Sequence, residues 1–499
     1  MDKRILRRTK SLSESLCDKQ VVSIRMLSSG HSEEMGYYRL LGNAHLSEIA
    51  LSNLCYEQVQ SLIGGRHVLA LSDSTDFDYS SHKGRIKSNS GLGYIGNHKG
   101  FGYNAHVSLV LDAASETIYG LSDLQLWHRA EAQSAYRKLK EADHRRSCLK
   151  KKGLSEMVLS SEESAELRDL QDFSVEIGKK KYKTQYELPL EERESYRWTS
   201  GCEKSNGILA QAAQITHVHD REGDIYDTFV KIMPTGRDLL IRSRSNRSVE
   251  TLKGESKYLH EYRKELPELG RYRIQVKDRE TGKERWATLS LKAAEVKVKR
   301  GRLNAFYQVE YPQAVPLTVV YAEEVPESVP EGKSPIFWCL LTTHKVHTLE
   351  QAQQITYWYS LRWWIELLFR LVKKDGFNLE SSELETGYAL RKLGILTMQA
   401  AIHVLQLKQA RNGDQTLPIE AVFSNTEIAC LEAMEPKLNG NTLKLSNPHP
   451  PKTLPWASWI IARIGGWKGY KNNRPPGIIT LKKGLDNFRL IAQGFSIFT

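Results

Sequence analysis

The sequence is poor in cysteine and has no long apolar run, and each shortage excludes a class of protein. The six cysteines lie far apart among 499 residues, and no two of them form a Cys-x-x-Cys pair. We therefore expect neither a disulfide framework nor a cysteine-based zinc site. No stretch approaches the roughly 18 uninterrupted apolar residues of a membrane helix, and the basic N-terminus lacks the apolar core of a secretory signal. These absences predict a soluble, intracellular protein without a membrane partner.

Positive charge is in excess. Lys and Arg number 71 against 59 Asp and Glu, which gives a formal net charge of +12. Because neutralisation of phosphates by Lys and Arg dominates nucleic-acid affinity, this excess is consistent with a polyanionic partner, although it is a weak signal by itself.

The order of strand and helix patterns predicts an α/β core. Strand-like runs cover 68–73, 105–112, 117–122, 215–220 and 239–244, and a helical pattern lies at 225–233. The resulting order, β-β-β-α-β-α-β, favours a mixed five-stranded sheet flanked by helices. The chain divides into a helical module at 1–62, the first part of the core at 63–245, a β-rich insertion at 246–335, the last part of the core at 336–383 and a helical domain at 384–499. A strongly charged stretch from about 129 to 195 is expected to be solvated.

A run near residue 366 carries the most specific pattern. Tyr359, Arg362, Glu366, Arg370 and Lys373 fall within about 80° of arc on a regular helix, and the opposite face is apolar. Thr-Leu-Glu-Gln at 348–351 predicts the capping-box start of this helical region, and Asp-Gly at 375–376 predicts its end. One carboxylate among three cations and a phenol suits a divalent metal held against phosphates.

Two further acids stand at the ends of predicted buried strands, Asp73 and Asp220. With Glu366 they supply the hard oxygen ligands that Mg²⁺ or Mn²⁺ prefers, and two such ions can clamp the attacking and leaving oxygens of a phosphoryl displacement. The alternative for any single strand-end Asp is that it caps the following turn. His217 and His219 flank a buried valine without Cys or His partners at metal spacing, which favours packing or support of the acids over zinc binding.

These motifs resemble those of a known family. Tyr-x2-Arg-x3-Glu-x6-Lys at 359–373 is similar to the YREK signature of bacterial cut-and-paste DDE transposases of the insertion-sequence-four group. Leu-Ser-Asp-Ser-Thr-Asp-Phe at 71–77 and Asp-Arg-Glu-Gly-Asp at 220–224 resemble the family's first and second Asp segments. Arg-Ile-Gly-Gly-Trp at 463–467 is similar to a late block. The resemblance covers nearly the whole chain, and the motifs occur in the family's order.

The resemblance implies an RNase H-like catalytic core, an N-terminal DNA-binding module and a C-terminal dimerisation module. It implies two Mg²⁺ ions, for which Mn²⁺ can substitute, on Asp73, Asp220 and Glu366. The implied reaction is cleavage of transposon ends through a DNA hairpin and strand transfer into target DNA, in the bacterial cytoplasm at the nucleoid. The implied partners are double-stranded DNA, as terminal inverted repeats and target, and a second copy of the chain.

The resemblance also implies DNA contacts. Tyr359, Arg362 and Lys373 would contact phosphates near the cleaved end, and Arg370 stands where relatives commonly have lysine. Trp338 precedes Tyr359 by the distance at which relatives place an aromatic that stacks on a displaced base, although a core position in an apolar strand is an equal alternative. Arg242 and Arg244, which alternate outward on the fifth strand, are further candidates, with a merely solvated strand face as the alternative.

Two other functions remain open at this stage. A standalone RNase H-like nuclease would share the acids, but the basic insertion and the C-terminal helical region argue against it. A catalytically silent protein that binds DNA or dimerises with an active copy is favoured by one observation: Arg-Arg-Thr at 7–9 resembles an early block of the family, with less sequence ahead of it than relatives usually carry. An end-cleavage assay separates these functions.

Overall fold

A computed structural model describes most of the chain. The described residues are 2–96, 100–129, 142, 144–150, 160–178, 190–277, 284–301, 311–411, 413, 417–440, 442, 445–470 and 475–498. Part of the charged stretch expected to be solvated, including Lys151 and Lys179, lies outside them. No described helix combines the length and apolar character needed to cross a membrane.

Twelve strands of the described chain form one mixed sheet flanked by helices. They are β1 (His67–Asp78), β2 (Gly93–Ile95), β3 (Gly100–Asp112), β4 (Ile118–Trp127), β5 (Gln214–His219), β6 (Asp238–Arg242), β7 (Ser248–Thr251), β8 (Ser256–Tyr258), β9 (Gly270–Lys277), β10 (Glu284–Lys299), β11 (Ala314–Glu324) and β12 (Phe337–Thr342). All the strands expected from the sequence are present. The short β2 was not predicted, and β1 runs five residues beyond its expected end at Asp73.

The middle of the sheet is parallel. β1 pairs with β5 and β5 pairs with β6 in parallel, whereas β3 is antiparallel to β1 and β4 is antiparallel to β3. Ser72 of β1 is paired with His219 of β5, so the residues that follow, Asp73 and Asp220, come at the same end of neighbouring strands. This register gathers groups that are far apart in the sequence.

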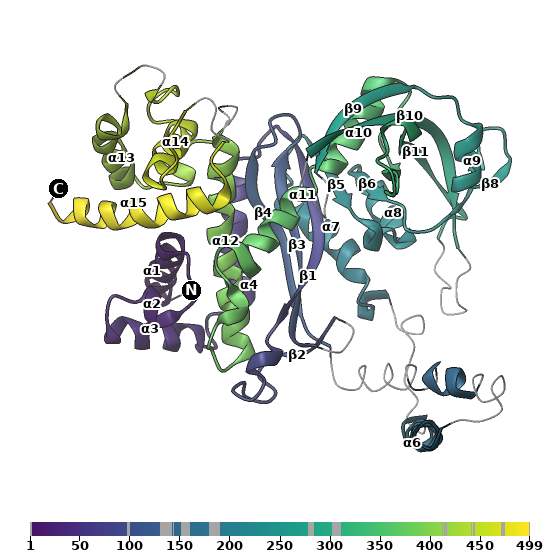
Figure 1. Ribbon diagram of the computed structural model, residues 1–499, viewed down its shortest axis with the longest axis horizontal. Coiled ribbons are helices and arrows are strands. Elements are labelled where there is room, and N and C mark those ends of the chain that lie inside the picture. Colours follow the sequence, from purple (N-terminus) through teal and green to yellow (C-terminus); the bar gives the residue numbers. More distant parts are fainter. Residues whose placement is uncertain are drawn as a thin grey trace.

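The sheet is larger than the five strands expected for the core. β12 pairs with β6, and β11, β10, β7 and β8 continue outward from it, so the strands of residues 246–335 extend the sheet of the core. Figure 1 shows them as the teal and green part of the molecule, beside the blue and purple strands β1, β3 and β4. Backbone hydrogen bonding along β12 makes the two regions one sheet.

Helices lie on both faces of the sheet. They are α1 (Lys3–Lys19), α2 (Ile24–Leu27), α3 (His31–Leu41), α4 (Glu48–Gln60), α6 (Ser161–Gly178), α7 (Tyr196–Ile208), α8 (Tyr226–Ile232), α9 (Leu259–Glu265), α10 (Leu349–Ser360), α11 (Trp363–Arg370), α12 (Gly387–Ala410), α13 (Asn425–Leu438), α14 (Leu454–Ile464) and α15 (Ile478–Phe498). α11 packs on β1, and α4 and α12 pack on β4, while α7 contacts β4, β3 and β1. In Figure 1, α11 crosses in front of the strands and α12 runs beside them.

The long helix α12 joins the first and last parts of the chain. It contacts α1, α3 and α4 from the N-terminal region and α14 and α15 from the C-terminal region. Most of its residues are buried, and they belong to the same hydrophobic core as β1 and β3. Burial of this apolar surface holds the helical regions against the sheet and fixes the frame on which the candidate site stands.

Candidate active site at the ends of β1 and β5

Asp220 directly follows the last residue of β5, as the sequence predicted, whereas Asp73 lies inside β1, beside the point where β5 ends. Asp73 Oδ1 accepts a hydrogen bond of 2.8 Å from the backbone N–H of Ser74. Asp220 Oδ1 accepts one of 2.7 Å from the backbone N–H of Glu222 and so caps the short 3₁₀ turn η4 (Arg221–Gly223). The capping role that was the alternative for Asp220 is therefore real, and its other carboxylate oxygen is left for a second role.

The turn after Asp220 is fixed by close packing and by a buried ion pair. A side chain at Gly223 would place its Cβ 2.6 Å from the Cβ of His219, so the turn requires glycine here. Asp224 is fully buried and accepts 2.8 Å hydrogen bonds from Arg247 Nε and from the backbone N–H of Arg244. A buried charge is tolerated because it is paired and hydrogen-bonded.

Glu366 is supplied by a helical region that is broken, contrary to the expectation of one regular helix. The capping box at Thr348–Gln351 is confirmed, but α10 ends at Ser360. The N–H of Arg362 bonds the carbonyl of Tyr359 three residues back, which is the tight spacing of a turn, and α11 starts afterwards. A π-helical turn, η7 (Leu371–Asp375), then precedes Gly376.

This break changes which polar groups share a face. Tyr359 is only 5% exposed, so its side chain is not presented to solvent as expected. Arg362 stands at the junction of α10 and α11, and Glu366 lies one turn further on. The apolar side expected opposite them is confirmed, since Leu368 and Val372 are fully buried.

Arg362 joins two of the three acids. Its Nη1 lies 2.6 Å from Asp73 Oδ2, and its Nη2 donates to Glu366 Oε1. Burial raises the pKa of Asp73 to about 7; Arg362 acts to lower it, and Asp220 and Glu366 raise it further. The pKa of Arg362 is raised: burial acts against its charge, but Asp73, Tyr359, Glu366 and Asp220 outweigh burial. The three acids therefore lie close enough to act on one another and on one guanidinium.

Lys373 lies at the same end of the sheet but is held by other acids. Its Nζ is 3.0 Å from Asp76 Oδ1 and 3.7 Å from Glu380 Oε1, and it stands 5.6 Å from the ring centre of Phe77. Asp76 was not among the residues expected at the site. It follows Asp73 by three residues in β1. Its pairing with Lys373 was not predicted, because the strand was expected to end at Asp73.

Of the other residues predicted to contact DNA, some lie near the site and others are bonded to other parts of the chain or exposed. Trp338 on β12 is partly buried and meets Tyr359 edge to face, with ring centres 5.4 Å apart. β6 ends at Arg242, whose Nη2 donates to the carbonyl of Phe337 at 2.9 Å. Arg244 is exposed beyond the strand end, so the two arginines do not alternate on a strand as expected. Arg370 is exposed at the end of α11.

His217 and His219 are fully buried beneath Asp220 on β5. His217 Nε2 is 2.8 Å from Asn206 Oδ1, and His219 Nε2 is 3.4 Å from Cys202 Sγ. Burial lowers the pKa of both histidines to about 3, so both are neutral. They pack and support the strand, as the sequence favoured.

The donor set at the strand ends fits a hard divalent cation in kind. Asp73 and Glu366 already share one positive group, and Asp220 lies within electrostatic reach of both Asp73 and Arg362. Within the described part of the chain, no three His, Cys, Asp or Glu side chains converge closely enough to form a ready-made metal shell. Binding a metal here would therefore require the guanidinium of Arg362 to leave the carboxylates.

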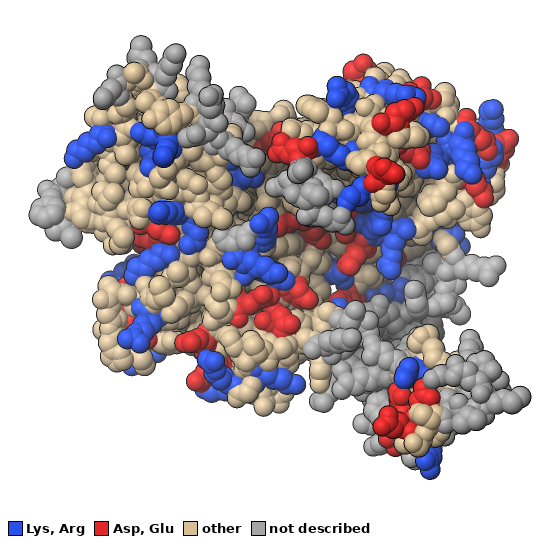
Figure 2. Space-filling view, in the orientation of Figure 1, with Lys and Arg blue, Asp and Glu red and all other residues tan. Residues whose placement is uncertain are grey.

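Charge on the surrounding surface is mixed. Figure 2 shows Lys and Arg side chains interspersed with Asp and Glu over the middle of the drawn face, where α11 and α12 lie in Figure 1. The excess of positive charge is therefore not collected there into one continuous basic patch. A polyanion on this face would meet some cations that are already paired with acids, such as Lys373.

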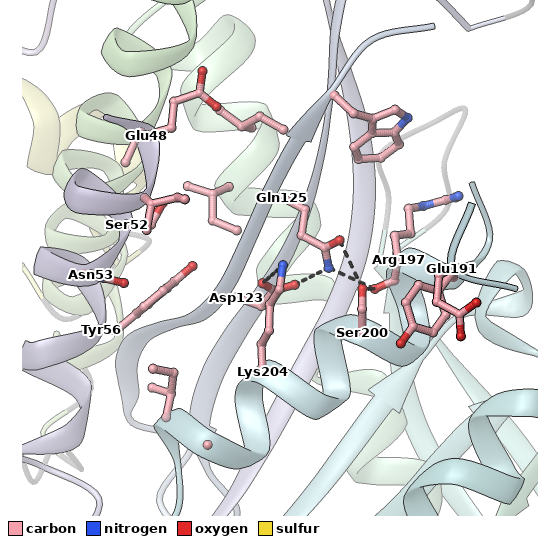
Figure 3. Close-up of a pocket in the computed structure, with 18 of the residues that line it drawn as sticks. Glu48, Ser52, Asn53, Tyr56, Asp123, Gln125, Glu191, Arg197, Ser200 and Lys204 are labelled. Atoms are coloured by element: carbon pink, nitrogen blue, oxygen red, sulfur yellow. Dashed lines mark hydrogen bonds and ion pairs between the residues drawn. The ribbon is translucent and has the colours of Figure 1, made fainter. Parts of the chain in front are cut away.

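A separate cavity of about 720 Å³ lies between α4, β4 and α7. Figure 3 shows Asp123 and Lys204 on its wall, with Gln125 reaching toward Ser200. Asp123 Oδ2 accepts a 2.5 Å hydrogen bond from Gln125, and burial raises the pKa of Asp123 to about 6. Arg197, on the same wall, also bonds Ser74 and Glu222, which lie next to Asp73 and close to Asp220 in the sequence. The sequence did not predict this role for Arg197, because it lies on α7, outside the two Asp motifs.

No protein-family model matches the chain.

Proposed function

We propose that this chain is a DNA transposase of the DDE type, which cleaves transposon ends through a hairpin and joins them to target DNA. The proposal rests on the resemblance of the 71–77, 220–224 and 359–373 segments to the insertion-sequence-four group. The observation that carries it is geometric: Arg362 bonds both Asp73 and Glu366, and the parallel register of β1 and β5 brings Asp220 beside Asp73.

The strand order supports this proposal. β4-β3-β1-β5-β6, with the order β1-β3-β4-α7-β5-α8-β6 along the chain, is the succession expected for an RNase H-like core. In an open sheet with parallel strands, sites form beyond the carboxyl ends of those strands. Asp220 stands at that end of β5, and Asp73 lies in β1 directly after the last residue paired with β5.

The side chains divide the chemistry between them. Asp73, Asp220 and Glu366 would hold Mg²⁺ or Mn²⁺, which when bound stabilises the attacking and leaving oxygens of an in-line displacement. Asp73 would lose its proton as the metal binds, because its raised pKa keeps it partly protonated near neutral pH. Arg362 and Lys373 would turn from their acids to DNA phosphates, where charge-assisted hydrogen bonds orient the strand.

The test is cleavage of a duplex that carries the inverted repeats flanking the gene, with Mg²⁺ and purified full chain. We expect nicking at the repeat ends that is abolished in Asp220→Asn. Asp238→Asn is the matched control, because Asp238 begins β6 and so lies at the amino ends of the parallel strands, away from Asp220. Binding without cutting by both wild type and Asp220→Asn would instead support the silent regulator. A second copy of the chain is expected in the active complex, one for each end.

A further inference from the structure

A buried arginine on the opposite face of the sheet connects the two strand-end acids. Arg197 on α7 has only 14% of its side chain exposed. Its Nε donates to Ser74 Oγ at 3.1 Å, and its Nη2 donates to Glu222 Oε2 at 2.8 Å. Ser74 directly follows Asp73, and Glu222 comes two residues after Asp220. One guanidinium therefore spans from β1 to the turn after β5.

The residues that Arg197 holds are the ones that orient the acids. The backbone N–H of Ser74 donates to Asp73 Oδ1, and the backbone N–H of Glu222 donates to Asp220 Oδ1. Each carboxylate is thus fixed by a backbone group whose own side chain is bound to Arg197. Because successive side chains of a strand point to opposite faces, Asp73 faces α11 while Ser74 faces α7.

The guanidinium is itself held rigidly. Its third nitrogen, Nη1, donates to the carbonyl of Glu194 at 2.8 Å, and its Cζ lies 5.3 Å from the Trp127 ring centre and 5.7 Å from that of Trp198. The Glu194 carboxylate is in turn bound by Arg129 at 2.8 Å. Arg197 donates hydrogen bonds in three directions and lies against two indole rings. The planar guanidinium of arginine can do both, whereas the ammonium of lysine cannot.

We infer that Arg197 is a positioning residue that sets the separation and orientation of Asp73 and Asp220 through Ser74 and Glu222. This inference rests on the proposed function, since it assigns a role toward the same metal-binding acids. Groups that orient metal ligands from behind typically change metal affinity by about 10–100-fold when they are altered. The bond to Ser74 is partly buried, whereas the Glu222 side chain is 61% exposed, and the two partners come from different segments, so the two arms of Arg197 can be removed separately.

The experiment measures Mn²⁺ binding to the full chain by electron paramagnetic resonance, at pH 8 and without DNA. We expect Arg197→Lys to weaken Mn²⁺ binding by roughly 10–100-fold and Glu222→Gln to weaken it less. The matched control is Arg285→Lys, because Arg285 is a half-buried arginine that binds Glu324 with two nitrogens in the β-rich region. Arg285→Lys should bind Mn²⁺ as wild type does. DNA affinity in EDTA should be unchanged in Arg197→Lys, and higher Mg²⁺ should restore its cleavage rate.

The outcomes separate this inference from the function on which it rests. If Asp220→Ala loses Mn²⁺ binding while Arg197→Lys and Glu222→Gln bind as wild type, the positioning role is wrong and the metal site stands. If Asp220→Ala binds Mn²⁺ as wild type does, the metal site and the inference both fail. If thermal unfolding shows that Arg197→Lys is not folded, the variants Ser74→Ala and Glu222→Gln decide the question. The double variant should then weaken Mn²⁺ binding more than either single variant.

Discussion

Arg362 Nη1 lies 2.6 Å from Asp73 Oδ2, across 289 positions of sequence, and the same guanidinium donates to Glu366. The arginine that the family resemblance directs at a DNA phosphate is thus the counter-ion of two proposed metal ligands. A guanidinium and a divalent ion compete for the same oxygens. DNA that draws Arg362 onto a phosphate would free both carboxylates, so metal and DNA binding should favour each other.

Replacement of Arg362 tests this competition. Arg362→Gln removes the cation that occupies Asp73 and Glu366, so Mn²⁺ should bind about five- to tenfold more tightly without DNA at pH 8, the equivalent of about 1 kcal/mol. DNA affinity should fall in the same variant, because a phosphate contact is lost. Calorimetric titration with Mn²⁺ measures the first effect. Weaker Mn²⁺ binding in Arg362→Gln would show that the guanidinium supports the metal site and does not compete with the ion.

The raised pKa of Asp73 predicts a pH dependence of stability. Its pKa in the folded chain is about 7, above its ordinary value of 3.8, so ionising it is unfavourable in the fold. The stability that this group contributes is fully present below about pH 4 and is lost as the pH rises through about 7. Thermal unfolding in EDTA should show wild type losing stability relative to Asp73→Asn between pH 5 and 8. Parallel pH curves for the two proteins would contradict the shift.

The closeness of Asp73 and Asp220 was predictable from the sequence because each directly follows a buried run, and the two runs pair in parallel. A parallel register that pairs Ser72 with His219 brings Asp73 beside Asp220 whatever the loops between them do. The capping box at Thr348 was predictable for a similar reason, since its hydrogen bonds lie within four residues.

The geometry of the helical region was not predictable. A regular 3.6-residue period predicts that Tyr359 and Lys373 share one helix face. The turn before Arg362 and the π-helical turn at η7 each rotate the following side chains around the helix axis, so this prediction fails. Those irregularities come from tertiary packing, which overrides local propensity. Arg197 was invisible for a different reason: its partners, Ser74 and Glu222, are identified only when α7 is placed on the sheet.

Lys373 should contribute to DNA affinity once it leaves Asp76 and Glu380. Lys373→Ala removes one phosphate contact, so the slope of log affinity against log salt should become shallower by about one. Fluorescence anisotropy on a repeat-end duplex between about 50 and 200 mM salt measures it. Lys345→Ala is the control, since Lys345 also pairs with an acid, Glu295, but next to the β-rich strands. Equal slopes for Lys373→Ala and wild type would remove Lys373 from the interface.

Substitutions at Trp338 can distinguish base stacking from core packing, the two roles that its sequence position allows. Its indole is partly buried and meets Tyr359 edge to face, with ring centres 5.4 Å apart. If it stacks on a displaced base, Trp338→Leu should lose about 1–3 kcal/mol of affinity for a hairpin end with an unpaired base, and much less for a fully paired blunt end. Trp338→Tyr should retain most of the difference, because a phenol ring also stacks. Trp286→Leu, at a tryptophan 55% exposed on β10, is the matched control and should bind both DNAs as wild type does. An equal loss on both DNAs, accompanied by a lower unfolding temperature, would assign Trp338 to packing beneath Tyr359 alone.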